Sequence, residues 1–420
     1  MPPTADTTGV GQTSWVTSAP DTAIDADAVR ACFPALDGGT AFFDGPGGSQ
    51  TPTAVADAVR AAMLQPLSNR GHGTAAARNA EAIVVDCRTA LADLLNAHPD
   101  EVIFGRSMTA LTFDLSRTLS AGWGPGDEVV VTRLDHDANV RPWVIAAAAA
   151  GATVRWVDFD ADTGELPVEN VAAQLSDRTR LVAVTAASNL IGTMPDVRAI
   201  ADLTHAAGAL LYVDGVHYTA HGVVDVGGLG ADFYACSPYK FLGPHCGAVA
   251  GRADVLAALR PAKLLPSTDR VPERFELGTL PYEVMAGATA AVDFLAGLTG
   301  ADGSRRERLV ASMGALEAHE DGLRRRIESG LGELVGVRIH SSASRRTPTL
   351  LVTFEGRDAA EVSAVLAEHD VNAPAGSFYA YEAARLLGLG DAGGLRIGLA
   401  PYNTAADVDR LLDVLGDVLA

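Results

Sequence analysis

The chain has 420 residues, a length that suits two domains better than a single hydrophobic core. Hydrophobic residues make up 48% and charged residues 20%, and no apolar run is long enough to cross a membrane, so we expect a soluble protein without a membrane partner. The net charge of -20 disfavours a nucleic-acid partner, because phosphates attract basic surfaces.

Residues 1–22 are rich in Thr, Ser, Pro and Gly, and they lack the basic and apolar regions of a signal peptide. We therefore expect a flexible arm there and a cytoplasmic protein. The four cysteines, Cys32, Cys87, Cys236 and Cys246, form no Cys-x-x-Cys pair. This spacing indicates neither a zinc site nor a disulfide framework, and it agrees with a reducing compartment. We predict no metal site.

Short β-rich runs alternate with helical patterns from about residue 80 onward. The runs are EVIFG from 101, DEVVVT from 127, ATVRWVDF from 152, RLVAVTAAS from 180, ALLYVDG from 209, DFYACS from 232 and GAVAG from 247. Ala-rich stretches at Val55–Met63 and Val197–Ala207 have the helical period. This alternation predicts an α/β domain with a mostly parallel, seven-stranded sheet. Ligands of such sheets bind at the carboxyl ends of the strands, where Ser188 and Asp214 would lie.

A change in composition at Leu298–Arg308 (LTGADGSRRER) predicts the start of a second, smaller domain. This domain would contain the β-rich runs GVRIHSS from 336 and TLLVTFEG from 349, and the closing amphipathic helix AADVDRLLDVLGDVL from 405. We therefore predict a segment at 23–37 that packs on the small domain, a large domain at 38–296 and a small α+β C-terminal domain at 297–420.

The segment Leu211–Gly247 places an aspartate at the end of one apolar run and a lysine just after the next. Asp214 ends LLYVD, and Lys240 follows the turn that begins at Ser237. A carboxylate that pairs with a pyridinium nitrogen and a lysine that forms a Schiff base are the two groups that pyridoxal phosphate most requires. The spacing therefore indicates a pyridoxal phosphate site. The alternative is that Asp214 caps a turn and that Lys240 is a surface lysine.

Six further motifs, together with Leu211–Gly247, resemble class V aminotransferases, which are fold-type I pyridoxal phosphate enzymes, and in particular their cysteine desulfurase-like branch. These motifs are FFDGPGGSQTP (Phe42–Pro52), FGRSMTALTF (Phe104–Phe113), LDHDANVRPW (Leu134–Trp143), SNLIGT (Ser188–Thr193), FELGT (Phe275–Thr279) and LRIGLAPYNT (Leu395–Thr404). The resemblance covers residues 28–418. It implies a fold-type I transferase fold, pyridoxal 5'-phosphate as cofactor and a homodimer whose active site is shared between subunits.

By this resemblance, Lys240 is the Schiff-base and proton-transfer residue, and Asp214 pairs with the pyridine nitrogen. His136 would stack on the cofactor ring and relay protons. His217 stands where desulfurases carry a glutamine, and it would donate a hydrogen bond near the phenolate oxygen. The remaining cofactor contacts would come from Met108, Thr109, Ser237, Tyr239, Asn189 and, across the dimer interface, Thr279.

Arg396 matches the carboxylate-binding arginine of the family, with Asn189 assisting, and its alternative role is a strand-edge salt bridge. His72 and Tyr379 are further candidates for substrate contact. In desulfurases, the loop that corresponds to Ala373–Leu386 carries the cysteine that attacks sulfur. Tyr379 takes that place here, and no cysteine follows Cys246. The resemblance is therefore to the desulfurase-like subgroup that lacks this thiol, which disfavours persulfide formation.

These residues predict a pyridoxal phosphate-dependent lyase or transferase that acts on an amino acid as a small-molecule substrate. We expect a C–S lyase that eliminates a thiol from an S-substituted cysteine and yields pyruvate and ammonia. Decarboxylation-coupled deamination, aminotransfer and epimerisation stay open, because they use the same cofactor and differ in the bond at Cα that is broken. A non-catalytic, desulfurase-like interaction protein is the alternative from a different class.

Overall fold

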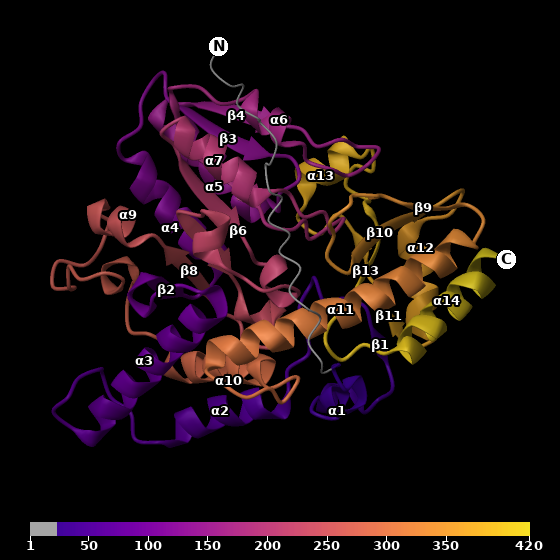
Figure 1. The fold of residues 1–420 in the computed structure, drawn as a ribbon, viewed down its shortest axis with the longest axis horizontal. Coiled ribbons are helices and arrows are strands. Elements are labelled where there is room, and N and C mark those ends of the chain that lie inside the picture. Colours follow the sequence, from indigo (N-terminus) through magenta and orange to yellow (C-terminus); the bar gives the residue numbers. More distant parts are fainter. Residues whose placement is uncertain (1–22) are drawn as a thin grey trace, which may run out of the picture.

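A seven-stranded sheet organises the larger part of the protein, as Figure 1 shows for the computed structural model, which describes residues 23–420. The strand order is β2-β8-β7-β6-β5-β3-β4, and every neighbouring pair is parallel except the two that involve β8. The strands are β2 (Val102–Gly105), β3 (Glu128–Thr132), β4 (Thr153–Val157), β5 (Thr179–Thr185), β6 (Leu210–Asp214), β7 (Phe233–Cys236) and β8 (Gly247–Gly251). Each overlaps a predicted run, so the mostly parallel sheet is confirmed.

Helices cover both faces of this sheet. One face packs against α3 (Ala75–Leu95), α7 (Val197–Ala206) and α10 (Tyr282–Ala296), and the other against α4 (Met108–Ser120) and α5 (Arg141–Ala150). Within β5, Val182 faces the first group and Leu181 the second, because successive strand residues point to opposite faces. Both faces are therefore apolar, which explains the nearly continuous hydrophobic runs. The other helices of this part are α2 (Thr53–Leu64), α6 (Val168–Ala172), α8 (Val226–Leu229) and α9 (Ala253–Ala258).

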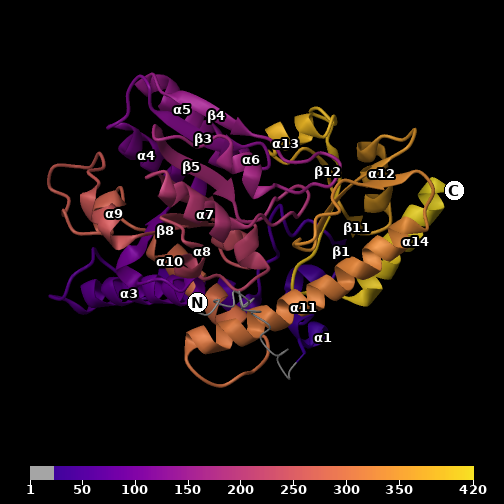
Figure 2. The ribbon, with the colours of Figure 1, turned by 45° about the horizontal axis from the view of Figure 1, so that its top comes forward.

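The C-terminal part is built on a four-stranded antiparallel sheet in the order β12-β13-β10-β9. Its elements are α11 (Arg305–Gly332), β9 (Val337–Ile339), β10 (Thr349–Phe354), α12 (Ala359–Glu368), β11 (Val371–Asn372), β12 (Ala375–Gly376), α13 (Tyr381–Leu386), β13 (Gly394–Gly398) and α14 (Ala405–Leu419). The two predicted strands and the closing helix are confirmed. Figures 1 and 2 both show α11 running from beside α10 to beside α14, so this one helix packs on both parts.

The N-terminal residues pack on the C-terminal part before the chain enters the large sheet. Arg30 of α1 (Ala26–Arg30) pairs with Asp407 of α14 at 3.0 Å. The short strand β1 (Ala41–Phe42) pairs in parallel with β11, and Phe43 is buried in the C-terminal core. The predicted division of the chain at residues 38 and 297 stays a prediction, and the predicted arm at 1–22 lies outside the described residues.

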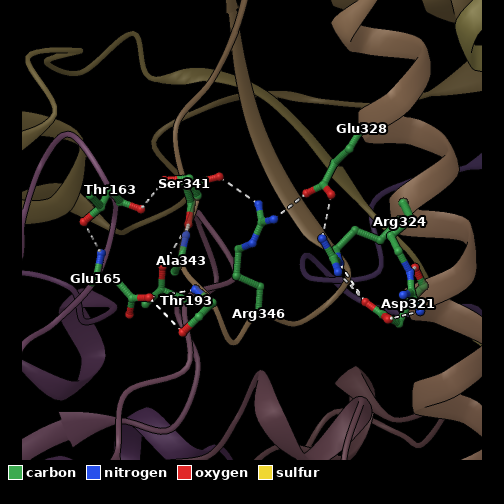
Figure 3. Close-up of polar contacts among 12 residues, drawn as sticks. Thr163, Glu165, Thr193, Asp321, Arg324, Glu328, Ser341, Ala343 and Arg346 are labelled. Carbon is green, nitrogen blue, oxygen red and sulfur yellow. Dashed lines mark hydrogen bonds and ion pairs between the residues drawn. The ribbon is translucent and has the colours of Figure 1, made fainter.

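A polar seam joins the two parts, as Figure 3 shows for residues that include Thr163, Glu165, Thr193, Asp321, Arg324, Glu328, Ser341 and Arg346. The hydroxyls of Thr193 and Ser341 lie 3.1 Å apart. Arg346 donates to the carbonyl of Ser341 at 2.7 Å and pairs with Glu328 of α11 at 2.8 Å. The Thr193–Ser341 contact holds the loop that follows β5 against the loop between β9 and β10, and Arg346 joins that second loop to α11. Within residues 23–420, no helix combines the length and apolar character needed to cross a membrane.

Candidate active site

A cavity lies at the carboxyl ends of the central strands. We call it the inner cavity. It gathers a large share of the predicted site residues: Met108, Thr109, His136, Asn189, Asp214, His217, Ser237, Tyr239 and Lys240. Pro46, Ala138, Thr185, Ala187 and Val216 complete its lining. Arg396, His72, Thr279 and Tyr379 do not line it.

Asp214 ends β6 and is 4% exposed. Its Oδ1 accepts a hydrogen bond from the backbone N–H of Val216 at 2.9 Å. Burial raises the pKa of the Asp214 carboxyl to about 6, although the Val216 bond and the Lys240 charge oppose the shift. The next residue is Gly215, where a Cβ would lie 1.9 Å from the ring of Tyr234. The glycine therefore lets the chain turn closely over β7 and leaves the carboxylate at the cavity wall.

Lys240 lies in a 3₁₀ turn (Pro238–Lys240) that follows β7. Its Nζ donates to the carbonyl of Pro46 and lies 4.8 Å from the ring centroid of Tyr239. Tyr239 in turn stacks on His245 at 4.7 Å. Burial lowers the pKa of Lys240 to about 8, and the charge of Arg396 adds to this effect. An amine with a lowered pKa in a wall of the cavity reaches its neutral form more readily than an ordinary lysine, which suits a nucleophile or a base.

The amine of Lys240 is expected to become reactive at lower pH than an ordinary lysine. Because the pKa is lowered to about 8, the neutral fraction rises as pH increases through that value. Brief acetylation of the apoprotein over a pH series, followed by peptide mass spectrometry, measures the midpoint. Lys263 is the only other lysine in the sequence and serves as an internal control. A Lys240 midpoint near about 10, the ordinary range of lysine, would contradict the predicted shift.

His136 stands at the start of a 3₁₀ turn (Asp137–Asn139), where its Nδ1 accepts from the N–H of Ala138 at 3.0 Å. Burial, together with the Lys240 charge, lowers the pKa of His136 to about 4, so the ring is neutral at neutral pH. The neighbouring Asp135 is buried, accepts from Asn139 at 2.7 Å and bonds the hydroxyl of Thr132. The sequence analysis did not predict Asp135 as a site residue, although its position just after an apolar strand could have indicated it.

The N-terminus of α4 forms one end of the inner cavity, where Met108 and Thr109 line it. The Ser107 hydroxyl caps the helix by accepting from Ala110 at 3.1 Å. A Cβ at Gly247 of β8 would lie 2.1 Å from the backbone nitrogen of Met108, so glycine allows the strand to approach the helix end. Free N–H groups and the positive end of the helix dipole make this end suitable for a phosphate.

His217 joins the inner cavity to the C-terminal sheet. Its Nε2 lies 2.9 Å from the hydroxyl of Thr347 and 3.1 Å from that of Thr349. The ring of His221 packs edge-on against it at 4.8 Å, and Nδ1 of His221 bonds the buried Glu320 of α11 at 2.8 Å. Burial lowers the pKa of His217 well below its ordinary value, so His217 is neutral. The sequence analysis predicted none of these four residues. Thr347, Thr349 and Glu320 lie far from His217 in the sequence, and the nearby His221 belongs to no motif.

The double substitution Thr347→Val and Thr349→Val is expected to weaken cofactor binding and to lower the unfolding free energy by about 1–3 kcal/mol. The reason is that the buried Nε2 of His217 loses both partners. Thr353→Val is the matched control, because Thr353 on the same strand bonds His340 at 2.7 Å and does not line the inner cavity. Urea unfolding and titration with pyridoxal phosphate measure the two effects. Equal loss of cofactor affinity in the control would show that His217 is not involved.

Arg396 lies on β13 and is 2% exposed. Its guanidinium pairs with Asp44 at 2.7 Å and donates to the carbonyl of Asn189 at 3.2 Å, and the ring centroid of Phe378 lies 3.6 Å from its Cζ. The Nε of Arg396 and the Oδ1 of Asn189 are buried and have no partner within residues 23–420. Substrate carboxylate binding by Arg396 stays a prediction, since the guanidinium already holds an ion pair. The unpartnered atoms leave bonding capacity for a ligand.

Three predicted residues besides Arg396 lie outside the inner cavity. Tyr379 is 77% exposed, but its ring lies 5.6 Å from that of His136. His72 and Thr279 are both exposed, and each lies in a connecting segment, before α3 and before α10 respectively. Their substrate and cross-subunit roles stay predictions, because they line no part of the cavity formed by this single chain.

The side chains present fit pyridoxal phosphate. A helix N-terminus that can bind a phosphate, a buried carboxylate and an amine with a lowered pKa surround one cavity. A cationic ring nitrogen beside Asp214 would favour the ionised carboxylate, which burial alone disfavours. The groups that the cofactor needs are therefore all present at one site.

Comparisons with known proteins agree with this arrangement. The family model described as Aminotransferase class-V matches residues 41–411. The chain is 33% identical to the aminotransferase-like protein FGM3 of Gibberella zeae, covering 93% of this chain and 98% of that protein. It is 30% identical to a cysteine desulfurase of Dickeya dadantii, covering 92% and 95%. The crystal structure of the Escherichia coli cysteine desulfurase CsdA superposes with a TM-score of 0.83 at 27% identity, covering 94% and 99%.

The family match, the relatives and the fold lead to one assignment. The match spans both parts of the chain and includes every residue that lines the inner cavity. The chain therefore belongs to the aminotransferase class-V family of fold-type I enzymes, with pyridoxal 5'-phosphate as its cofactor.

Proposed function

We propose that the protein is a C–S lyase that removes a thiol from an S-substituted cysteine by β-elimination. The observation that carries this proposal is the loop 376–380. By resemblance this loop holds the sulfur-attacking cysteine in desulfurases, but here it places the ring of Phe378 over Arg396 and that of Tyr379 beside His136. An aromatic wall cannot accept sulfur, whereas it can contact the substituent of a thioether.

The cysteines support this exclusion of persulfide chemistry. Cys87, Cys236 and Cys246 are buried. Burial raises the pKa of Cys87 and of Cys236 to about 12, and it raises the pKa of Cys246 well above its ordinary value. Cys32 is exposed, but it lines no part of the inner cavity. No thiolate is therefore placed to attack a substrate sulfur.

When bound, pyridoxal phosphate withdraws electrons from Cα of the amino acid. The amine of Lys240 would accept the Cα proton, and Asp214 would pair with the protonated ring nitrogen of the cofactor. Arg396 and Asn189 would orient the substrate carboxylate, and neutral His136 would shield the cofactor from water. The Cα–H and Cβ–S bonds break, a Cα–Cβ double bond forms, and the thiolate leaves with the C–S electron pair. Hydrolysis of the released aminoacrylate gives pyruvate and ammonia.

Incubation with a panel of S-substituted cysteines, free cysteine and ordinary amino acids tests the proposal, with products followed by mass spectrometry. The expected products are pyruvate, ammonia and the matching thiol. Accumulation of pyridoxamine phosphate would favour aminotransfer instead, release of CO₂ would favour decarboxylation-coupled deamination, and inversion at Cα would favour epimerisation. Formation of a persulfide from free cysteine would indicate desulfurase activity and contradict the proposal. A protein that stays colourless with added cofactor would favour the non-catalytic alternative.

A homodimer in the cytoplasm is part of the proposal. Leu277 beside Thr279 is 61% exposed, and Leu264 and Leu265 in a nearby segment are 66% and 96% exposed. A second copy that covers these apolar side chains would also bring Thr279 to a neighbouring site. Light scattering of Leu265→Glu against the native protein tests this, since a charge in the interface shifts the mass toward the monomer. Unchanged mass would contradict the interface.

A further inference from the structure

A second cavity adjoins the inner cavity. It is lined by Asp137, Arg141, Ser377, Phe378, Tyr379 and Tyr381, and we call it the outer pocket. Figures 1 and 2 show α13, which begins at Tyr381, lying toward the large sheet rather than beside α14. Two aromatic residues separate the cavities: Phe378 faces Arg396, and Tyr379 faces His136. The outer pocket therefore lies next to the site where the amino acid would react, with Phe378 and Tyr379 between them.

The wall between the cavities is held in an unusual backbone conformation. Phe378 and Tyr379 have φ values of 51° and 58°, a left-handed region that bulky residues rarely adopt. Two hydrogen bonds keep them there. Asn189 donates to the carbonyl of Phe378 at 2.9 Å, and the N–H of Asp137 donates to the carbonyl of Tyr379 at 2.8 Å. This backbone conformation is energetically unfavourable for Phe378 and Tyr379, and it places both of their rings at the site.

The chemistry of the outer pocket favours an uncharged, planar group. Arg141 pairs with Asp137 at 2.7 Å and with Glu382 at 3.1 Å, so the charges around the pocket compensate one another. Tyr379 is 77% exposed, and Tyr381, with Arg385 over one face of its ring at 4.2 Å, is 39% exposed, which leaves aromatic surface open to a ligand. Exposed rings beside neutralised charges contact aromatic or apolar groups more favourably than ionic ones.

We propose that the outer pocket binds the sulfur substituent of the substrate and selects aryl or arylmethyl thioethers. This inference rests on the proposed function, because it requires the amino-acid end to lie between Arg396 and Lys240. With the carboxylate at the unpartnered Nε of Arg396, the substrate side chain would extend past His136 and Tyr379 into the outer pocket. Free cysteine has no group to fill this pocket.

Binding of ligands that cannot react separates recognition from chemistry. S-Benzyl-2-methylcysteine and 2-aminoisobutyrate both lack the Cα proton, so neither undergoes elimination. Titration of the holoenzyme, followed by calorimetry, gives a dissociation constant for each. The native protein is expected to bind the benzyl compound about tenfold more tightly, and Tyr379→Ala is expected to reduce this ratio to about twofold. Tyr379→Phe retains the ring and should retain the ratio.

Two further variants complete the design. Tyr381→Ala tests the second ring independently, and Val335→Ala is the surface control, since Val335 is 92% exposed and lies outside both cavities. A ratio near one in the native protein, or a ratio unchanged in both tyrosine-to-alanine variants, would overturn the inference. Preferential binding of the benzyl compound without pyruvate from S-benzylcysteine would support the outer pocket and refute elimination. Equal kcat/KM for all S-substituted cysteines in native and variant proteins would support elimination and refute the outer pocket.

Discussion

Lys240→Ala is expected to reduce turnover by about a thousandfold or more, because it removes both the Schiff-base amine and the base at Cα. The amine lies in the wall of the inner cavity with a pKa lowered to about 8, and no second lysine is available there. The purified variant should also lose the absorbance band of the lysine-bound cofactor. Steady-state kinetics and an absorbance spectrum measure the two losses.

Lys263→Ala is the matched control for this substitution. Lys263 is the only other lysine of the chain, it pairs with Asp269 at 3.2 Å, and it does not line the inner cavity. Its replacement should leave turnover and the absorbance band unchanged. If Lys240→Ala kept both, the assignment of the active-site lysine would be wrong.

Asp214→Asn is expected to lower turnover by about a hundredfold to a thousandfold, because an amide cannot balance a cationic ring nitrogen. The same substitution should stabilise the apoprotein at neutral pH. The folded-state pKa of Asp214 is raised to about 6 from an ordinary 3.8, so folding opposes ionisation. The native state therefore binds more protons, and stability falls as pH rises from about 4 to 6, by at most about 3 kcal/mol.

The stability gain and the loss of turnover identify Asp214 as a functional rather than a structural carboxylate. Urea unfolding of the apoprotein on both sides of this pH range measures the first effect. Asp232→Asn provides the contrast, since the buried Asp232 is paired with Arg252 and lies 3.0 Å from His205. Breaking that network should destabilise the protein at neutral pH. Loss of stability in Asp214→Asn of the same size would point to a structural role.

The strands were predictable because both faces of the large sheet are covered by helices. Each buried strand then appears as a short apolar run between polar turns, and Asp214 and Lys240 stand out because they end or follow such runs. The N-terminus of α4 was found for the same reason, since Met108 follows β2 after a short turn. These signals are local, and a single segment contains each of them.

The partners of these residues could not be predicted in the same way. Asp44 and Arg396 lie 352 positions apart, and His217 lies 130 and 132 positions from Thr347 and Thr349. Their pairing depends on how the C-terminal sheet packs against the large one, which no local pattern records. The sequence also could not predict that His72 and Thr279 are exposed, because both lie in connecting segments.

By itself, the sequence determined the cofactor chemistry, since an aspartate after one strand and a lysine after the next are properties of neighbouring residues. Only the tertiary structure decided what surrounds that chemistry. It brings the ring of Phe378 against Arg396 and that of Tyr379 against His136, and it buries Lys240 deeply enough to lower its pKa to about 8. The physical reason is that desolvation and contact depend on the distance in space between groups, which packing of the two parts of the chain sets.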